Sequence, residues 1–197
     1  MRPAASRFGA GALVVAALAV GQVLNERLPE SDNASRPFET YVKMGETAEL
    51  RAGDLTPRSV EGAMKLIRES SNIDAAGVAV VVHFDFVSGP KARSMTYAQF
   101  RGGDGTTAHF GSFGERSVLA CPAAPPGLVV HCTAVFDIDP DSLVGSTLMV
   151  APNSLDERFD GAATIDLGIE QSDVKRWKAT NELEVVETAV DGLEWVN

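Results

Sequence analysis

Residues 77–87 read GVAVVVHFDFV and carry the clearest secondary-structure signal in the chain. One side of the alternation holds Val78, Val80, Val82, Phe84 and Phe86, and the other holds Ala79, Val81, His83, Asp85 and Val87. A two-residue period rich in β-branched and aromatic side chains predicts a β-strand. Residues 127–138 repeat the pattern, with Val130, Cys132, Ala134, Phe136 and Ile138 on one side. We therefore expect two long strands, each with one strongly apolar face.

Shorter stretches with strand character surround these two, and turn residues separate them about every ten residues. They cover residues 44–50, 55–63, 92–100, 107–110, 117–121, 144–150 and 163–167. Pro57 lies inside the second of them, which predicts a bulge or an edge position there. The whole pattern predicts an all-β fold, an immunoglobulin-like antiparallel β-sandwich.

Two segments have helical rather than strand spacing. Residues 62–69 read GAMKLIRE, and residues 171–179 carry Val174 and Trp177 three positions apart. In the second segment we expect a short helix with Ser172 as its N-cap and Asp173 in its first turn.

The N-terminus predicts the compartment. Residues 1–7 contain two arginines and no acid, and residues 8–24 (FGAGALVVAALAVGQVL) contain no charge. Basic residues before an apolar run orient the N-terminus to the cytoplasm and send the following chain outward. The run is either an uncleaved transmembrane anchor or a signal sequence cleaved after Ala17-Leu18-Ala19. We expect a single-pass membrane protein whose anchor contacts the lipid bilayer, followed by a polar linker over residues 25–37.

Composition excludes several classes of protein. The 197 residues include 17 Lys and Arg against 27 Asp and Glu, which gives a net charge of −10. A nucleic-acid partner is not expected, because phosphates would be repelled. Three histidines and two cysteines are too few for a zinc ribbon or an iron–sulfur cluster. We therefore expect no cofactor.

The two cysteines, Cys121 and Cys132, are eleven positions apart and flank a proline-rich loop. In an oxidising compartment an even number of cysteines at loop ends favours a disulfide. The alternative is a pair of separate buried thiols.

Some motifs resemble a known group of domains. These are VKMGET at residues 42–47, the strand at 78–86, TAVFDID at residues 133–139 and DLGI at residues 166–169. They look like the telokin-like, immunoglobulin-related extracytoplasmic domains of unknown function in single-pass actinobacterial membrane proteins. The resemblance covers about residues 38–177 and implies no catalytic residues.

Two polar groupings are candidates for metal binding. His83 and Asp85 share one face of a strand, and His131 is a candidate neighbour, so imidazole and carboxylate ligands could meet. Asp137, Asp139 and Asp141 suggest calcium, but neither the glycine nor the glutamate of a calcium loop is present. For both groupings we favour ordinary polar positions on strands and turns, and we predict no metal site and no catalytic residues.

The C-terminal part is acidic but contains apolar residues. Residues 151–197 hold eleven acids against four basic residues, interleaved with Val185, Val186, Leu193 and Trp195. These four are the predicted partner-binding residues, with packing of Trp195 onto its own domain as the alternative.

The expected organisation is a β-sandwich over residues 38–180 with an acidic extension over residues 181–197. We expect a non-enzymatic, membrane-tethered domain that binds another membrane or cell-envelope protein. The alternatives are a protein that binds a small ligand or metal, or an envelope hydrolase, which would need a nucleophile–base contact such as a serine within reach of His83 or His131.

Overall fold

The computed structural model describes residues 38–68, 72–109, 117–152, 161–185 and 188–190. Within them the chain is all-β apart from one α-helix and one 3-10 helix. The strands are β1 (Phe38–Lys43), β2 (Ala48–Leu50), β3 (Gly53–Ile67), β4 (Asn72–Ser88), β5 (Tyr97–Arg101), β6 (Thr107–His109), β7 (Val118–Ala120), β8 (Val129–Ile138), β9 (Thr147–Ala151), β10 (Gly161–Asp166), β11 (Leu183–Glu184) and β12 (Ala189–Val190). The helices are a 3-10 turn at Pro140–Ser142 and α2 (Gln171–Ala179).

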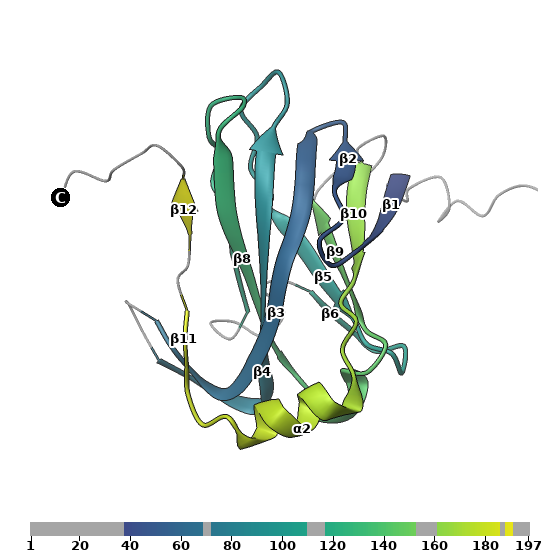
Figure 1. Ribbon diagram of the computed structural model, residues 1–197, viewed down its shortest axis with the longest axis vertical. Helices are drawn as coiled ribbons and strands as arrows, with labels where there is room; N and C mark the ends of the chain where they lie inside the picture. Colours follow the sequence, from purple (N-terminus) through teal and green to yellow (C-terminus); the bar gives the residue numbers. More distant parts are fainter. Residues whose placement is uncertain (1–37, 69–71, 110–116, 153–160, 186–187, 191–197) are drawn as a thin grey trace, which may run out of the picture. The chain divides into compact units, whose positions relative to one another are not determined.

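The strands form two sheets (Figure 1). Sheet A has the order β1-β10-β9-β5-β6, and sheet B has the order β11-β3-β4-β8-β12, with β2 beside β3 and β7 beside β8. Most neighbours are antiparallel, but β1 runs parallel to β10 and β11 runs parallel to β3. The all-β prediction is confirmed, and both sheets are mixed rather than fully antiparallel, because β1 and β11 join the edges of their sheets in parallel.

The main core lies between the two sheets. It contains the predicted apolar faces of β4 and β8 together with Leu148, Val150 and Ile165 from sheet A. The rings of Phe100 on β5 and Phe136 on β8 meet across the layers with centroids 5.9 Å apart. Burying each of these large side chains contributes roughly 1.5–3 kcal/mol to the stability of the fold.

A second, smaller core lies on the other face of sheet B. It contains Ala63, Leu66, Ile73, Ala79, Val81, Val135 and Val185. The sequence predicted an apolar face and a half-solvated face for β4. The structure instead buries Ala79 and Val81 beneath the C-terminal segment, because Val185 packs against them.

The hairpin of β3 and β4 must curve strongly to accommodate this segment. Leu183 on β11 pairs with Leu66 on β3, and Leu66 pairs with Ile73 on β4. Ala189 on β12 pairs with His131 on β8, and His131 pairs with Asp85 on β4. On a straight strand, the twelve positions from Ile73 to Asp85 would extend about 40 Å. The four residues between Glu184 and Ala189 span at most about 18 Å. The hairpin therefore bends back toward the C-terminal segment, as Figure 1 shows.

Two register shifts between β3 and β4 contribute to this curvature. At the first, between Pro57 and Ser59, the extra residue is on β3, where a bulge or edge position was predicted. At the second, between Ala63 and Lys65, the extra residues are on β4, where residues 75–78 face a single residue of β3. Such bulges bend a strand and increase its twist. Residues 62–67 continue β3, so the helical spacing of residues 62–69 does not correspond to a helix.

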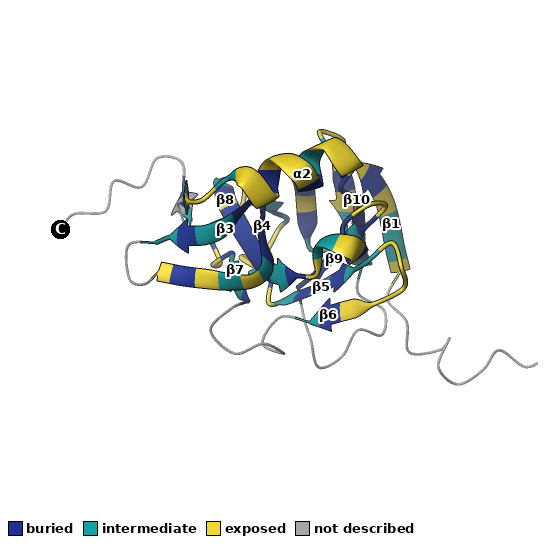
Figure 2. Ribbon diagram, turned by 90° about the horizontal axis from the view of Figure 1, so that it is seen from below, coloured by how far each residue is buried: buried dark blue, intermediate teal, exposed yellow. Residues whose placement is uncertain are grey.

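Helix α2 confirms the second helical prediction, but it begins differently. The N-cap is Glu170, whose amide donates to Asp173 Oδ2 at 3.0 Å, so the prediction of Ser172 as N-cap was wrong. A carboxylate at the third helical position satisfies the amide that a serine cap would leave free. Val174 and Trp177 are buried against the β domain, and the outer side of α2 is exposed (Figure 2).

No helix in the described residues is both long and apolar enough to cross a membrane. The expected anchor at residues 8–24 and the linker at residues 25–37 lie outside the described residues.

Candidate functional site

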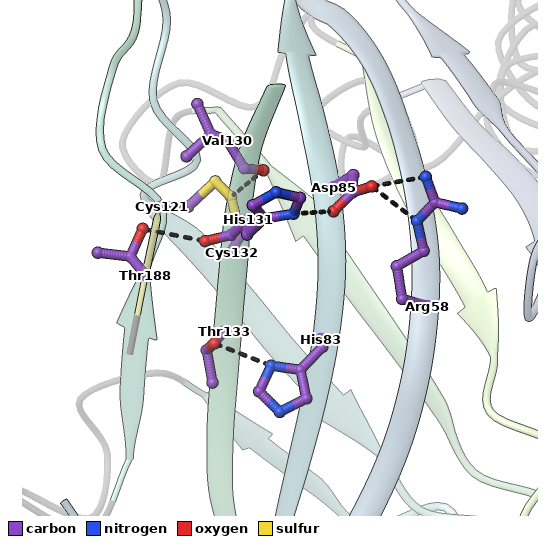
Figure 3. Close-up of polar contacts among 9 residues, drawn as sticks. All are labelled: Arg58, His83, Asp85, Cys121, Val130, His131, Cys132, Thr133 and Thr188. Atoms are coloured by element: carbon purple, nitrogen blue, oxygen red, sulfur yellow. Dashed lines mark hydrogen bonds and ion pairs between the residues drawn. A yellow bond between two sulfur atoms is a disulfide. The ribbon is translucent and has the colours of Figure 1, made fainter. Parts of the chain in front are cut away.

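Three strands of sheet B bring an arginine, an aspartate and a histidine together (Figure 3). Arg58 on β3 donates from Nε to Asp85 Oδ2 on β4 at 2.7 Å, and its Nη2 lies 2.6 Å from the same oxygen. His131 Nδ1 on β8 lies 2.7 Å from Asp85 Oδ1. Asp85 and His131 are direct cross-strand partners, so the neighbourhood suggested by the sequence is present.

This cluster joins strands. Each oxygen of Asp85 already has a protein partner, and the carboxylate is nearly buried. Arg58 and His131 are half-exposed, so each contact contributes modestly, on the order of 1 kcal/mol or less. In the part of the chain that is described, no three His, Cys, Asp or Glu side chains are arranged to hold a metal ion.

His83 makes a contact of the kind a hydrolase would need. Its Nδ1 lies 3.0 Å from Thr133 Oγ1 on β8. The Thr133 side chain is only 2% exposed, so its hydroxyl is closed to a substrate. Burial lowers the pKa of the His83 imidazole, and the Glu61 carboxylate offsets part of this effect. The nearby acid, Asp85, is occupied by His131 and Arg58. The pair therefore lacks an accessible nucleophile.

Two of the three aspartates considered for calcium, Asp137 and Asp139, accept hydrogen bonds from backbone amides. Asp137 accepts from the amides of Ala76 and Gly77 at 2.8 and 2.9 Å, where β4 bends. Asp139 accepts from the amide of Asp141 at 3.0 Å and caps the 3-10 helix. These carboxylates thus stabilise turns at strand ends.

The outer face of sheet A carries a polar network that sequence reasoning missed. Glu39 on β1 accepts from Thr164 on β10 at 2.6 Å and from Arg101 on β5 at 3.0 Å. Burial raises the pKa of Glu39, but hydrogen bonds from Thr164, Arg101 and Tyr41 outweigh it, so the pKa is lowered. His109 joins the same face through Tyr97, whose hydroxyl lies 2.9 Å from its Nδ1. The sequence did not predict the contacts of Glu39, because Glu39 is 62 residues from Arg101 and 125 residues from Thr164.

The predicted disulfide between Cys121 and Cys132 is present. Both residues are buried, and the bridge connects the end of β7 to the middle of its neighbour β8. It constrains the proline-rich loop beside the main core.

Of the four C-terminal residues predicted to bind a partner, the structure describes only Val185. Val185 is 3% exposed and packs in the second core, so its side chain is closed to a partner. β11 and β12 pair with β3 and β8, so the described part of the extension after residue 180 belongs to the β domain. Val186, Leu193 and Trp195 lie outside the described residues.

The open edge of sheet A carries exposed aromatic side chains. Phe38 is 70% exposed and Tyr41 is 72% exposed, and both lie on the edge strand β1. A shallow hollow of about 250 Å³ lies beside Tyr41 on the outer face. Its lining residues are Tyr41, Val42, Lys43, Glu46, Thr147, Thr164 and Asp166. The sequence signal was the short alternating segment FETYVK at residues 38–43, directly after the linker.

The chain matches no protein-family model and no curated protein sequence. A solved structure with some resemblance is the crystal structure of the yjhA protein from Bacillus subtilis. The two share 14% sequence identity and a TM-score of 0.44, over 63% of this chain and 99% of that chain. A likeness this weak supports no conclusion about fold family or function.

Proposed function

We propose that this chain is a non-enzymatic, extracytoplasmic domain, tethered to the membrane by residues 8–24, that binds another protein of the cell envelope. The Cys121–Cys132 disulfide supports an oxidising compartment, because such bridges persist outside the cytoplasm. The basic residues before the apolar run support the same orientation.

The proposal includes an immunoglobulin-like sandwich related to the telokin-like domains. Its support is the two facing sheets with one shared core. A parallel edge strand next to otherwise antiparallel strands is compatible with that architecture.

The observation that carries the proposed function is the composition of β1. Among the described residues, the large apolar side chains that are strongly exposed are Phe38, Tyr41 and Val144, and two of these three lie on one edge strand. Proteins usually protect sheet edges with charges, prolines or covering segments, since an open edge invites pairing with another chain. Exposed aromatic residues are also the anchors that most often dominate binding energy at protein interfaces.

The C-terminal extension is less suited to this role than the sequence suggested. Val185 is committed to the second core, and Leu183 packs at the border of that core. We therefore assign the binding surface to β1. The described part of the C-terminal extension packs on the second core instead.

The test is site-specific photo-crosslinking in intact membranes. A photoreactive phenylalanine analogue replaces Tyr41 in the full chain, and a matched control replaces the exposed Lys175 on α2. The proposal expects a discrete protein adduct from position 41 that is absent from position 175. Equal adducts at both positions, or none at position 41, would contradict it.

A further inference from the structure

We propose that the partner adds an extended segment to the open edge of β1 and places a Lys or Arg side chain in the hollow beside Tyr41. This inference rests on the proposed function and specifies the chemistry of the partner. It follows from the direction of the β1 backbone groups, the lining of the hollow and the charges around it.

The backbone groups of alternate residues of β1 point away from β10, toward the edge of sheet A. The Lys43 amide donates to Glu46 Oε2 at 2.8 Å, and the Lys43 carbonyl accepts from the Glu46 amide at 3.1 Å. Both groups of Lys43 thus point away from β10. Backbone groups alternate along a strand, so those of Glu39 and Tyr41 point to the same open side. An added strand would pair with these two residues, as in β-strand addition to a sheet edge.

The hollow lies where a side chain of such a strand would reach. Tyr41 and Lys43 on β1 pair with Thr164 and Asp166 on β10, and these four residues line it. A residue of the added strand next to β1 would lie two strand spacings, about 9.5 Å, from Asp166. Lys and Arg span this distance, with their apolar stems lying along the ring of Tyr41.

The charges favour a basic side chain. Asp166 Oδ1 accepts from the Gly168 amide at 3.0 Å, while its Oδ2 has no partner among the described residues. The hollow is lined by two carboxylates, from Asp166 and Glu46, and by one ammonium group, from Lys43. The chain as a whole carries a net charge of −10, which also attracts a basic partner. A cation above the exposed face of Tyr41 gains a further electrostatic attraction from the ring.

The experiment measures binding of three capped nine-residue peptides to the full chain in detergent micelles by fluorescence anisotropy. The peptides alternate Thr and Val and differ only at the central residue, which is Lys, norleucine or Glu. We expect the Lys peptide to bind about three- to fivefold more tightly than the norleucine peptide, as for a partly exposed ion pair. The Asp166→Asn variant should remove that difference and leave norleucine binding unchanged.

A second pair of variants tests strand addition itself. Tyr41→Pro removes the amide on the open side but none that β10 uses, and proline is tolerated at such edge positions. Tyr41→Val removes the ring and keeps the amide. We expect Tyr41→Pro to abolish binding of the Lys peptide and Tyr41→Val to weaken it only a few-fold. Hydrogen exchange of residues 38–43 should slow when the Lys peptide binds.

The outcomes separate this inference from the proposed function. If position 41 crosslinks a protein in membranes but the three peptides bind equally, or the Glu peptide binds best, the function stands and the basic side chain is refuted. Equal binding by the Pro and Val variants refutes strand addition. Self-association of the chain through β1 without peptide binding would assign this edge to a second copy and refute the basic partner.

Discussion

Gly62 on β3 lies directly beneath the indole ring of Trp177 on α2. A Cβ atom at position 62 would lie 2.6, 2.8 and 2.9 Å from Cδ2, Cε3 and Cγ of Trp177, closer than carbon atoms approach in proteins. Trp177 is buried, so its ring cannot move aside without disturbing the core. Gly62→Ala should therefore destabilise the fold by about 1–3 kcal/mol, the usual cost of overpacking. For a folded unit of this size, that cost corresponds to a Tm lowered by about 2–12 °C.

A double-mutant cycle isolates this contact. Trp177→Leu alone leaves a cavity, and in that background Gly62→Ala should cost less than about 0.5 kcal/mol, because the added methyl group fills free space. Gly161→Ala is the matched control, since a Cβ there meets Leu50 at an ordinary 3.6 Å. Thermal unfolding of the full chains, followed by circular dichroism, gives the four Tm values. Additive effects of Gly62→Ala and Trp177→Leu, or a Gly62→Ala variant as stable as the control, would refute the reasoning.

Three further predictions concern the disulfide, Glu39 and Val185. Replacing both cysteines with serine should cost about 2.8 kcal/mol for a loop of 11 residues and lower Tm by about 6–11 °C; two alkylatable thiols in exported wild-type protein would contradict the bridge. Because folding lowers the pKa of Glu39, its carboxylate stabilises the fold above pH 4.5, its ordinary pKa, and loses this effect as pH falls through the lowered folded value. The Tm difference between wild type and Glu39→Gln should thus narrow on acidification, and a constant difference would contradict the network. Val185→Asp would bury an unpaired charge, so amides of residues 183–185 and 188–190 should exchange rapidly; unchanged protection would mean that Val185 is not a core residue.

The parts of the fold that could be predicted are those determined by local pattern. β4 and β8 alternate strictly, and every residue assigned to their apolar faces lies in the main core. Helix α2 carries Val174 and Trp177 at helical spacing, and both are buried. The disulfide followed from compartment and spacing. In each case the signal comes from residues close together in sequence.

The parts that could not be predicted depend on contacts between distant segments. The position of β1 at the edge of sheet A could not be predicted, because its parallel partner β10 lies over 120 positions later in the chain. Residues 62–67 have helical spacing in the sequence but form the end of β3, because they pair with β4. The same holds for Val185, whose burial depends on a hairpin that curves toward the C-terminal segment. Apolar residues interleaved with acids are equally consistent with an extension that binds a partner and with a last strand that packs on the core.

The position of Val185 also bears on where recognition can occur. A segment that completes a second core cannot release its apolar side chains to a partner without exposing Ala79 and Val81 beneath it. The polar clusters on the outer faces are similarly committed: Asp85 holds Arg58 and His131, and Glu39 holds Thr164 and Arg101. β1 differs from both, because Phe38 and Tyr41 remain exposed while the Glu39 carboxylate beside them is fixed in place. A rigid edge with exposed aromatic residues would lose little conformational entropy on binding, which is the physical reason for proposing recognition at this strand.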